Sequence, residues 1–318
     1  MLPKEFENKL VLVTGGAGFI GSNLVDRLVK LNAKVTVLDD LFTGDVKNIH
    51  SMKYINFIRG SVTDRNLVKK LVKGVNLVFH LAARNIIVSM KNPYKDLQVN
   101  VFGTFNILEA ARKYKVERVV YTSSASVYGN GRYLPINEDD PLNILNPYAA
   151  SKLSGENYCM AFYETFGVPI AILRYSNVYG YHQSPKNGYC GVISKFFNNT
   201  RKGKSPEIHG DGEQTRDFTF VEDVVDATLL AAVSPKAEGE IFNVGTGKET
   251  SINELARAVI QLTGNSMKPV YVDRRDIDNL RRRVLNIEKI RKNLKWIPET
   301  PLKNGLEKTY EWFKSNGF

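Results

Sequence analysis

Three glycines at three-residue spacing constrain the fold of this chain more than any other feature of its sequence. Gly15, Gly18 and Gly21 follow the apolar run 9–13, which is typical of a buried strand, and precede or open the amphipathic stretch 19–31, which predicts a helix. Because glycine has no Cβ, the backbone of such a turn can approach a pyrophosphate at the helix N-terminus. The pattern predicts a dinucleotide-binding turn, and a tight strand-to-helix turn without a ligand is the alternative.

A pair of acids follows the second predicted strand. Residues 34–38 form a strand-like run that leads into Asp39 and Asp40. A carboxylate at this point can accept hydrogen bonds from the adenosine ribose of a bound dinucleotide. The 2′-phosphate of NADP would instead meet two carboxylates, with no Arg or Lys in the next few residues. The expected cofactor is therefore NAD.

Strand-like and helix-like segments alternate through the first half of the chain. The predicted strands are 9–13, 34–38, 55–59, 77–81, 118–122 and 169–175, and the predicted helices are 19–31, 64–72, 93–114 and 147–166. Short apolar strands joined by helices predict right-handed crossovers and an α/β fold, a Rossmann-type doubly wound parallel sheet. Ligands bind such sheets at the carboxyl ends of the strands.

After residue 175 the pattern loosens and predicts a smaller α/β C-terminal substrate lobe. One helix is predicted at 192–201. A helix at 218–233 and a strand at 241–244 are expected to return to the main sheet. The smaller lobe is completed by segments 250–263 and 306–313. We expect an NAD-binding domain at 1–175 plus about 218–245. The smaller lobe would comprise about 176–217 plus 246–318.

The bulk composition restricts the class of partner. The net charge is +11, but the lysines are scattered, so we expect a solvated surface rather than a nucleic-acid-binding face. No apolar run could span a bilayer, and no signal peptide is visible. Two distant cysteines, Cys159 and Cys190, favour a reduced, cytoplasmic setting. The four histidines lack metal-ligand spacing, so no metal is expected.

Polar residues that could carry chemistry follow the predicted strand at 118–122. A serine cluster at 123–126 stands at its carboxyl end, where a hydrogen-bonded turn is the alternative explanation. Tyr148 and Lys152 lie four residues apart, on one face of a predicted helix. The same spacing recurs at Tyr310 and Lys314, which we assign to an ordinary amphipathic helix. The order of the motifs, rather than this spacing, singles out Tyr148.

Taken together, the motifs resemble those of the extended short-chain dehydrogenase/reductases, specifically the NAD-dependent sugar-nucleotide epimerases. The resemblance covers nearly the whole chain and is strongest to UDP-glucose/UDP-galactose 4-epimerases. It rests on segments 14–21 (TGGAGFIG), 80–83 (HLAA), 100–104 (NVFGT), 123–129 (SSASVYG), 173–180 (LRYSNVYG) and 210–218 (GDGEQTRDF), and on Tyr148 with Lys152. The segments at 173–180 and 210–218 are particular to the sugar-nucleotide branch.

The resemblance implies a catalytic group of Ser124, Tyr148 and Lys152. Tyr148 would remove the proton of a sugar hydroxyl while hydride passes from that carbon to NAD, and Ser124 would hydrogen-bond the reacting oxygen. Lowering a tyrosine pKa from about 10 to about 7 requires about 4 kcal/mol. One cation about 5 Å away, such as Lys152, supplies about 3 kcal/mol at an effective dielectric of about 20, and oxidised nicotinamide would add to it. The transient 4-keto sugar would then turn over and take hydride back on its other face.

Binding residues carry over from the family by position. The residues implied for NAD are Gly15, Gly18, Phe19, Ile20, Gly21, Asp39, Asp40, Ser61, Val62, Leu81, Ala82, Ala83, Asn100, Thr122, Tyr148, Lys152 and Tyr175. Those implied for a nucleotide-diphosphate sugar are Ser124, Asn177, Val192, Ile208, Arg216, Arg274 and Arg275. Asn177, Arg216 and one of the last two arginines would hold the diphosphate, and Ile208 would lie beside the base. A surface ion pair of Arg216 with Asp217 or Glu213 is the alternative.

Two positions in segment 123–129, called the serine segment below, argue for epimerisation. Dehydratases of the family carry an Asp-Glu pair after the catalytic Thr, and the related decarboxylases carry Glu before Val-Tyr-Gly, whereas this chain has Ala125 and Ser126. The chain therefore lacks the acid that would eliminate water from a 4-keto sugar. We expect epimerisation at C4 of a UDP-hexose, either UDP-glucose/UDP-galactose or the N-acetyl forms.

Other departures from the family leave the substrate open. Ser61 replaces an Asp that often contacts adenine, Ser176 replaces a Phe, and the segments 84–90 and 274–283 are unlike those of typical UDP-glucose 4-epimerases. Another nucleotide sugar, such as a CDP-sugar epimerised at C2, is one alternative, and a non-catalytic NAD-sensing or nucleic-acid-binding relative is another. The resemblance also implies a homodimer formed by the helices at 93–114 and 147–166, with candidate contacts Leu97, Val101, Phe105, Leu108, Tyr158, Phe162 and Phe166.

Overall fold

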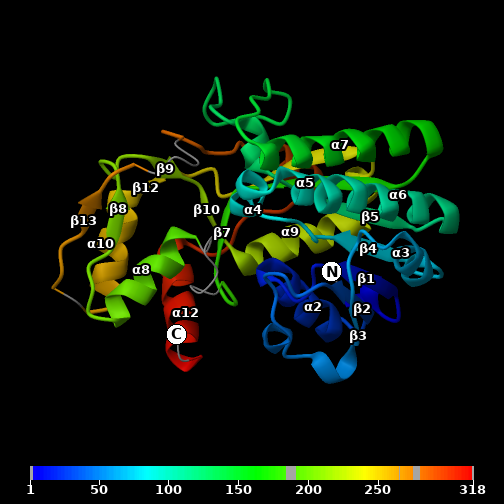
Figure 1. The fold of residues 1–318 in the computed structure, drawn as a ribbon, viewed down its shortest axis with the longest axis horizontal. Helices are drawn as coiled ribbons and strands as arrows, with labels where there is room; N and C mark the ends of the chain where they lie inside the picture. Colours follow the sequence, from blue (N-terminus) through cyan, green and yellow to red (C-terminus); the bar gives the residue numbers. More distant parts are fainter. Residues whose placement is uncertain (1–2, 184–190, 265, 275–279, 317–318) are drawn as a thin grey trace.

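A computed structural model describes residues 3–183, 191–264, 266–274 and 280–316. Its centre is a parallel sheet of seven strands in the order β11-β6-β5-β4-β1-β2-β3, which confirms the predicted doubly wound fold (Figure 1). The strands are β1 (Leu10–Thr14), β2 (Lys34–Asp39), β3 (Asn56–Arg59), β4 (Leu77–His80), β5 (Arg118–Ser124), β6 (Ile170–Tyr175) and β11 (Glu240–Val244). The strand order reverses between β1 and β4, and ligands bind beside such a reversal.

Helices cover both faces of this sheet. One face packs against α3 (Arg65–Val72), α6 (Gly103–Tyr114) and α7 (Pro147–Phe166), and the other against α2 (Phe19–Lys30), α9 (Val221–Val233) and α11 (Glu288–Leu294). Every residue of β4 and β6 is buried, as expected for parallel strands with both faces covered. A short α1 (Pro3–Phe6) precedes the sheet.

A second apolar core lies beside the sheet domain, around α8, α10 and α12 (Figure 1). These helices span Val192–Arg201, Ile252–Leu262 and Leu302–Ser315, and Phe197, Leu255 and Phe313 are fully buried among them. Three short strand pairs belong to this part of the chain: β7 (Asn177–Tyr179) with β10 (Phe218–Phe220), β8 (Glu207–His209) with β13 (Val270–Val272), and β9 (Thr215–Arg216) with β12 (Thr250–Ser251).

Most element boundaries lie within a few residues of those predicted, but several segments differ, and α1 and α11 lie where no helix was predicted. The predicted helix 93–114 is divided into α5 (Pro93–Asp96), a π-helix (Leu97–Phe102) and α6. The predicted helix 218–233 begins with the strand β10, and α4 (Ile86–Lys91) occupies a segment for which no helix was predicted. No helix in the described part of the chain is both long and apolar enough to cross a membrane.

Candidate active site

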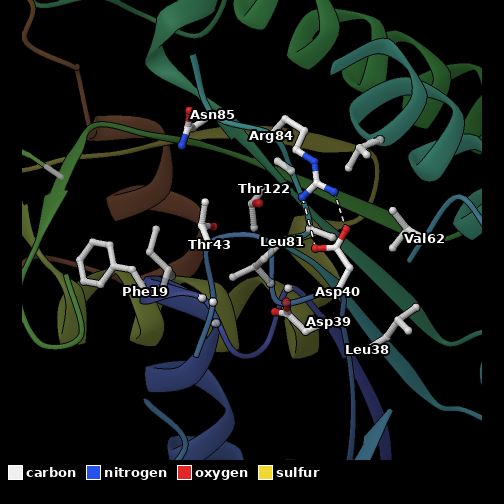
Figure 2. A pocket seen from close by; sticks show the side chains of 18 of the residues that line it. Phe19, Leu38, Asp39, Asp40, Thr43, Val62, Leu81, Arg84, Asn85 and Thr122 are labelled. Carbon is white, nitrogen blue, oxygen red and sulfur yellow. Dashed lines mark hydrogen bonds and ion pairs between the residues drawn. The ribbon is translucent and has the colours of Figure 1, made fainter. Parts of the chain in front are cut away.

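The glycine turn forms one wall of a cavity at the carboxyl ends of β1, β2 and β4 (Figure 2). Gly15 has a φ of +72°, and a Cβ added to it would lie 2.7 Å from the main-chain nitrogen of Ala82. A Cβ on Gly21 would lie 2.1 Å from the carbonyl oxygen of Gly15. The helix α2 begins directly after Gly18, which has no side chain to cover the first-turn amides. The cradle therefore suits a phosphate group approaching the main chain.

Asp39 lies at the end of β2 and borders this cavity. One carboxylate oxygen accepts from the main-chain nitrogen of Ala17 at 2.9 Å, and the other from that of Leu41 at 2.8 Å. Burial raises the pKa of Asp39, while these two hydrogen bonds oppose the rise. The carboxylate is thus fixed between the glycine turn and the loop that follows β2, where a ribose hydroxyl could reach its remaining lone pairs.

An arginine that the sequence analysis missed lies in the same cavity. Arg84 is buried and forms an ion pair with Asp40 (Figure 2). It also stacks over the Phe42 ring, with 4.2 Å between the guanidinium carbon and the ring centroid. No Arg or Lys stands in the few residues that follow the two acids, but Arg84 reaches Asp40 from the segment after another strand. Arg84 follows β4, far from Asp40 in sequence, and it could be found only by recognising that strands β4, β1 and β2 are neighbours.

The structure brings nearly all residues predicted for the cofactor into the wall of this one cavity. They are Gly15, Gly18, Phe19, Ile20, Gly21, Asp39, Asp40, Ser61, Val62, Leu81, Ala82, Ala83, Thr122, Tyr148, Lys152 and Tyr175. Wall residues that the sequence analysis did not name include Thr43, Gly44, Asn85 and Val99. The aromatic ring of Tyr175 borders the cavity, but its hydroxyl is hydrogen-bonded to Thr228 at 2.6 Å.

Asn100 differs from the expectation, because it is absent from the cavity wall. It is buried, and its side-chain oxygen accepts from the main-chain nitrogen of Arg84 at 2.7 Å. Its amide nitrogen lies within hydrogen-bonding distance of Asp96, Ser151 and the Arg84 carbonyl, at 2.6, 3.1 and 3.1 Å. Asn100 therefore supports the cavity wall from behind through main-chain contacts to residue 84.

Tyr148 borders two cavities at once. It lines the cavity of the glycine turn together with Lys152, and it lines a second cavity of about 720 Å³ together with Ser124. Asn146 caps the helix that carries Tyr148 and Lys152 by accepting from the Ala149 nitrogen at 2.9 Å. The three predicted catalytic residues therefore meet where the two cavities adjoin.

Lys152 and Ser124 each have a defined environment. The Lys152 ammonium is buried and donates to the main-chain oxygen of Thr122 at 2.5 Å, and burial lowers the pKa of Lys152 to about 8. The Ser124 hydroxyl donates to the Ser126 hydroxyl at 3.0 Å and accepts from the Ser126 nitrogen at 3.2 Å. The alternative of a hydrogen-bonded serine turn is thus present too, and it leaves Ser124 on the cavity wall.

A buried ion pair lies beneath the serine segment. Glu156, on α7, accepts from the Ser123 hydroxyl and from two nitrogens of Arg174, with Nη2 at 2.6 Å. Arg174 also donates to the Tyr128 hydroxyl at 2.8 Å. Both members of the ion pair are at most 4 % exposed, so the pair joins α7, β6 and both ends of the serine segment inside the protein.

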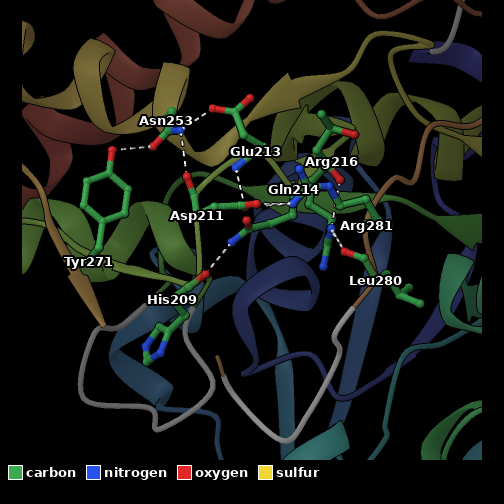
Figure 3. Close-up of polar contacts among 10 residues, drawn as sticks. His209, Asp211, Glu213, Gln214, Arg216, Asn253, Tyr271, Leu280 and Arg281 are labelled. Carbon is green, nitrogen blue, oxygen red and sulfur yellow. Dashed lines mark hydrogen bonds and ion pairs between the residues drawn. The ribbon is translucent and has the colours of Figure 1, made fainter. Parts of the chain in front are cut away.

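The second cavity holds most of the residues predicted for a nucleotide sugar. Asn177, Val192, Arg216 and Arg274 line it, whereas Arg275 lies outside the described residues. Arg216 is 8 % exposed and donates to the main-chain oxygens of Thr215 and Leu280, both at 2.9 Å (Figure 3). Its burial contradicts the alternative of a surface ion pair, and a buried guanidinium on a cavity wall suits an anionic ligand.

Ile208 does not lie on the cavity wall as predicted. It is fully buried in the core around α8, α10 and α12, while its neighbours Glu207 and His209 line the cavity. Because successive side chains of a strand point to opposite sides, the residues on either side of Ile208 face the cavity when Ile208 faces the core. That alternation is a signal that could have corrected the prediction.

Polar residues around His209 form a part of this wall that sequence reasoning missed. Gln214 donates to the His209 carbonyl at 2.8 Å, and Arg281 pairs with Asp211 at 2.7 Å (Figure 3). Arg283, which is buried, also lines the cavity. These residues come from segments some 70 positions apart along the chain, and no local motif marks their contact.

Comparison with known proteins finds a matching family and similar relatives. The model of the NAD dependent epimerase/dehydratase family matches residues 11–245. A putative UDP-glucose 4-epimerase of Methanocaldococcus jannaschii is 44% identical over 310 residues, which cover 96% of this chain and 99% of the relative.

Two solved structures are similar over their whole length. An epimerase from Methanothermobacter thermautotrophicus has a TM-score of 0.96 and 39% identity, covering 100% of this chain and 96% of its own. A UDP-glucose 4-epimerase from Thermotoga maritima, solved with UDP-glucose, has a TM-score of 0.92 and 35% identity, covering 97% of this chain and 99% of its own. The resemblance found in the sequence motifs is thereby confirmed, and the chain belongs to the NAD dependent epimerase/dehydratase family.

Proposed function

We propose that this protein interconverts the C4 epimers of a UDP-hexose with NAD as cofactor. The observation that carries the proposal is the position of Tyr148, which lines both the cavity of the glycine turn and the larger cavity beside it. A phenol at that junction can exchange a proton with a sugar hydroxyl in one cavity next to a dinucleotide in the other. The similarity to UDP-glucose 4-epimerases over nearly the whole chain supports the same reaction.

The residues around the glycine turn are the proposed NAD site. A side chain at Gly15 or Gly21 would fill the cradle, which supports a pyrophosphate there, and Asp39 would accept the adenosine ribose hydroxyls. NAD held there would supply the hydride acceptor and donor that inversion at C4 requires. Residues 1–175 with 218–245 would form this NAD-binding part, and 176–217 with 246–318 the part that binds the sugar nucleotide, except that α11 packs against the main sheet.

Tyr148 is the proposed base that removes the hydroxyl proton at C4. Its phenol needs a nearby cation to ionise near neutral pH, and Lys152 lies one helical turn away on the same face of α7. Lys152 would also hold the nicotinamide ribose. Ser124, which lines the larger cavity, would hydrogen-bond the reacting oxygen and fix its direction.

The larger cavity is the proposed site of the nucleotide sugar. Asn177, Arg216 and Arg274 would contact its diphosphate, with Val192 beside the nucleoside. Arg216 suits this task because two main-chain oxygens already fix its guanidinium.

Epimerisation rather than dehydration is proposed from the serine segment. Dehydratases and decarboxylases of the family carry an acidic residue in this segment. This chain has Ala125, which is buried, and Ser126, and neither has a carboxyl group. The protein should therefore release no 4-keto-6-deoxy sugar.

We also propose a homodimer formed through the layer of α5, the π-helix, α6 and α7, which together correspond to the helices predicted at 93–114 and 147–166. Of the residues expected at this interface, Leu108, Val101 and Phe162 are buried within the chain, and Phe105 packs against Tyr158 and Phe162. Apolar side chains that stay exposed on these elements are Tyr94, Leu97, Phe102, Tyr158 and Phe166. They supply the apolar surface that a dimer needs.

A reduced cytoplasmic setting is also proposed for this protein, and the free thiol of Cys159 supports it.

NMR of the purified protein tests the proposed function. The protein is incubated with NAD and, in separate tubes, with UDP-glucose, UDP-N-acetylglucosamine, UDP-glucuronate and a CDP-hexose. The anomeric signal of the C4 epimer in a UDP tube supports the proposal and identifies the sugar. No change in any UDP tube, or a 4-keto-6-deoxy product, contradicts it.

A further inference from the structure

An acidic and a basic side chain are buried near the start of α7, and the hydrogen-bond partners of both among the described residues are neutral. Lys152 is 4 % exposed, donates to the main-chain oxygen of Thr122, and lies 4.8 Å from the centroid of the Tyr121 ring. Asp96 is 2 % exposed and accepts from the Ser89 hydroxyl at 2.5 Å and from the Asn100 amide at 2.6 Å. A buried charge is costly unless an opposite charge compensates it.

Asp96 is connected to the helical turn that carries the proposed base. The Asn100 amide that donates to Asp96 also lies 3.1 Å from the Ser151 hydroxyl, and this hydroxyl donates to the main-chain oxygen of Tyr148 at 3.0 Å. Ser151 directly precedes Lys152. A short hydrogen-bonded path thus leads from the Asp96 carboxylate to the segment 148–152.

The other groups that face Lys152 cannot compensate its charge as well as Asp96 can. Glu156, one turn further along α7, is already paired with Arg174 through three hydrogen bonds. Burial lowers the pKa of His80 to about 3 and raises that of the Cys159 thiol well above its usual range, so both are neutral near pH 7. Tyr121, whose ring lies beneath the ammonium, is likewise kept neutral by burial.

We propose that Asp96 is a positioning residue that acts as the counter-ion of Lys152 and keeps its ammonium protonated inside the site. Asn100 and Ser151 hold the carboxylate beside the turn 148–152. In agreement, burial lowers the pKa of Lys152 to about 8, and Asp96 gives the largest opposing contribution, ahead of Glu156. The charge would be maintained whether or not a ligand is bound, while its use in catalysis rests on the proposed function.

Titration of Lys152 by NMR tests this proposal without any need for activity. Protein labelled with ε-13C-lysine gives one signal per lysine, and the Lys152→Met variant identifies the signal of Lys152. In Asp96→Asn we expect the Lys152 midpoint to fall by about one pH unit or more, because loss of a nearby opposite charge disfavours the ammonium. Ser89→Ala, which removes one hydrogen bond to Asp96 but no charge, should leave the midpoint near that of the unchanged protein. An equal midpoint in Asp96→Asn would overturn the proposal.

The unchanged protein supplies a test if Asp96→Asn does not fold. A Lys152 midpoint near pH 8 supports the proposal, and a midpoint below about pH 7 would overturn it, because the ammonium would then lack compensation for its burial. Asp96→Glu keeps the charge and should keep the midpoint.

The pH dependence of epimerisation gives a second readout. With UDP-glucose and NAD-loaded protein, the alkaline limb of kcat should move to lower pH in Asp96→Asn and return in Asp96→Glu. A fall in kcat at every pH, with an unmoved limb, would show a merely structural role and overturn the proposal. If UDP-glucose is not a substrate at all, the proposed function fails while the NMR titration still decides the role of Asp96.

Discussion

Asp40 and Arg84 form an ion pair that fastens the loop after β2 to the segment after β4. Arg84 also stacks on Phe42 from the same loop, with 4.2 Å between the guanidinium carbon and the ring centroid. The charge of Asp40 is therefore partly compensated on the cavity wall. Asp39, whose carboxylate accepts only main-chain N–H groups among its hydrogen bonds with the described residues, is left as the acid that a 2′-phosphate would meet.

The first prediction concerns the choice between NAD and NADP. NADP should bind at least about tenfold more weakly than NAD, which corresponds to about 1.4 kcal/mol, because its phosphate would approach the Asp39 carboxylate. Calorimetric titration of both dinucleotides measures the ratio. Asp39→Asn should narrow the ratio more than Asp40→Asn does, since Arg84 already compensates Asp40. Equal affinities of the unchanged protein for the two dinucleotides would refute the prediction.

The second prediction concerns the glycine cradle. Gly15→Ala should abolish measurable NAD binding, because its Cβ would lie 2.7 Å from the Ala82 nitrogen at a φ of +72°. Gly264→Ala is a matched control, with a φ of +67° and nothing within 4 Å of the added Cβ. Both variants should lose about 1–2 kcal/mol of stability from the left-handed backbone, and Gly15→Ala should lose more from the clash. Thermal unfolding with and without NAD separates the effects: only the control should still be stabilised by NAD.

The third prediction concerns the proposed base. Tyr148→Phe should lower kcat by about 10²–10⁴-fold, because it removes the hydroxyl that exchanges the proton and keeps the ring. Tyr310→Phe is the control, since Tyr310 has the same spacing to a lysine but lies on α12, stacked on Phe197 at 5.3 Å. Kinetics of both variants, with NAD binding measured alongside, check the prediction. Equal activity of Tyr148→Phe and the unchanged protein would exclude Tyr148 as the base.

The sequence predicted the sheet well, and most residues that it assigned to the cofactor line one cavity, because both depend on local patterns. Buried parallel strands are continuous apolar runs, and the glycines follow the first of them directly. It was harder to predict to which side of a strand a single side chain points, as Ile208 shows. The resemblance implied a place beside the base for Ile208, whereas the alternation of side chains along β8 directs Ile208 into the core.

Residues joined only by the folded chain could not be predicted in the same way. Arg84 meets Asp40 because β4 and β2 both flank β1, and no spacing in the sequence announces that contact. Asn100 was assigned to the cofactor from its motif, whereas its amide and carbonyl are used within the protein. A sequence motif can single out a residue such as Asn100, but the groups that this residue contacts depend on how the chain packs.

The fourth prediction concerns the buried ion pair of Glu156 and Arg174 beneath the serine segment. Arg174→Met should destabilise the protein by about 3–5 kcal/mol, because it leaves the Glu156 carboxylate buried without its charged partner. The double variant Glu156→Leu with Arg174→Met should recover most of this loss, since removing both charges also removes the cost of burying them. Urea unfolding of the single and double variants measures the recovery. Arg282→Met is the control, because Arg282 pairs with Glu249 on the surface and its loss should cost less than about 1 kcal/mol. If the double variant proves as unstable as Arg174→Met alone, the cost lies in lost packing and hydrogen bonds to Tyr128 and Ser123 rather than in an uncompensated charge.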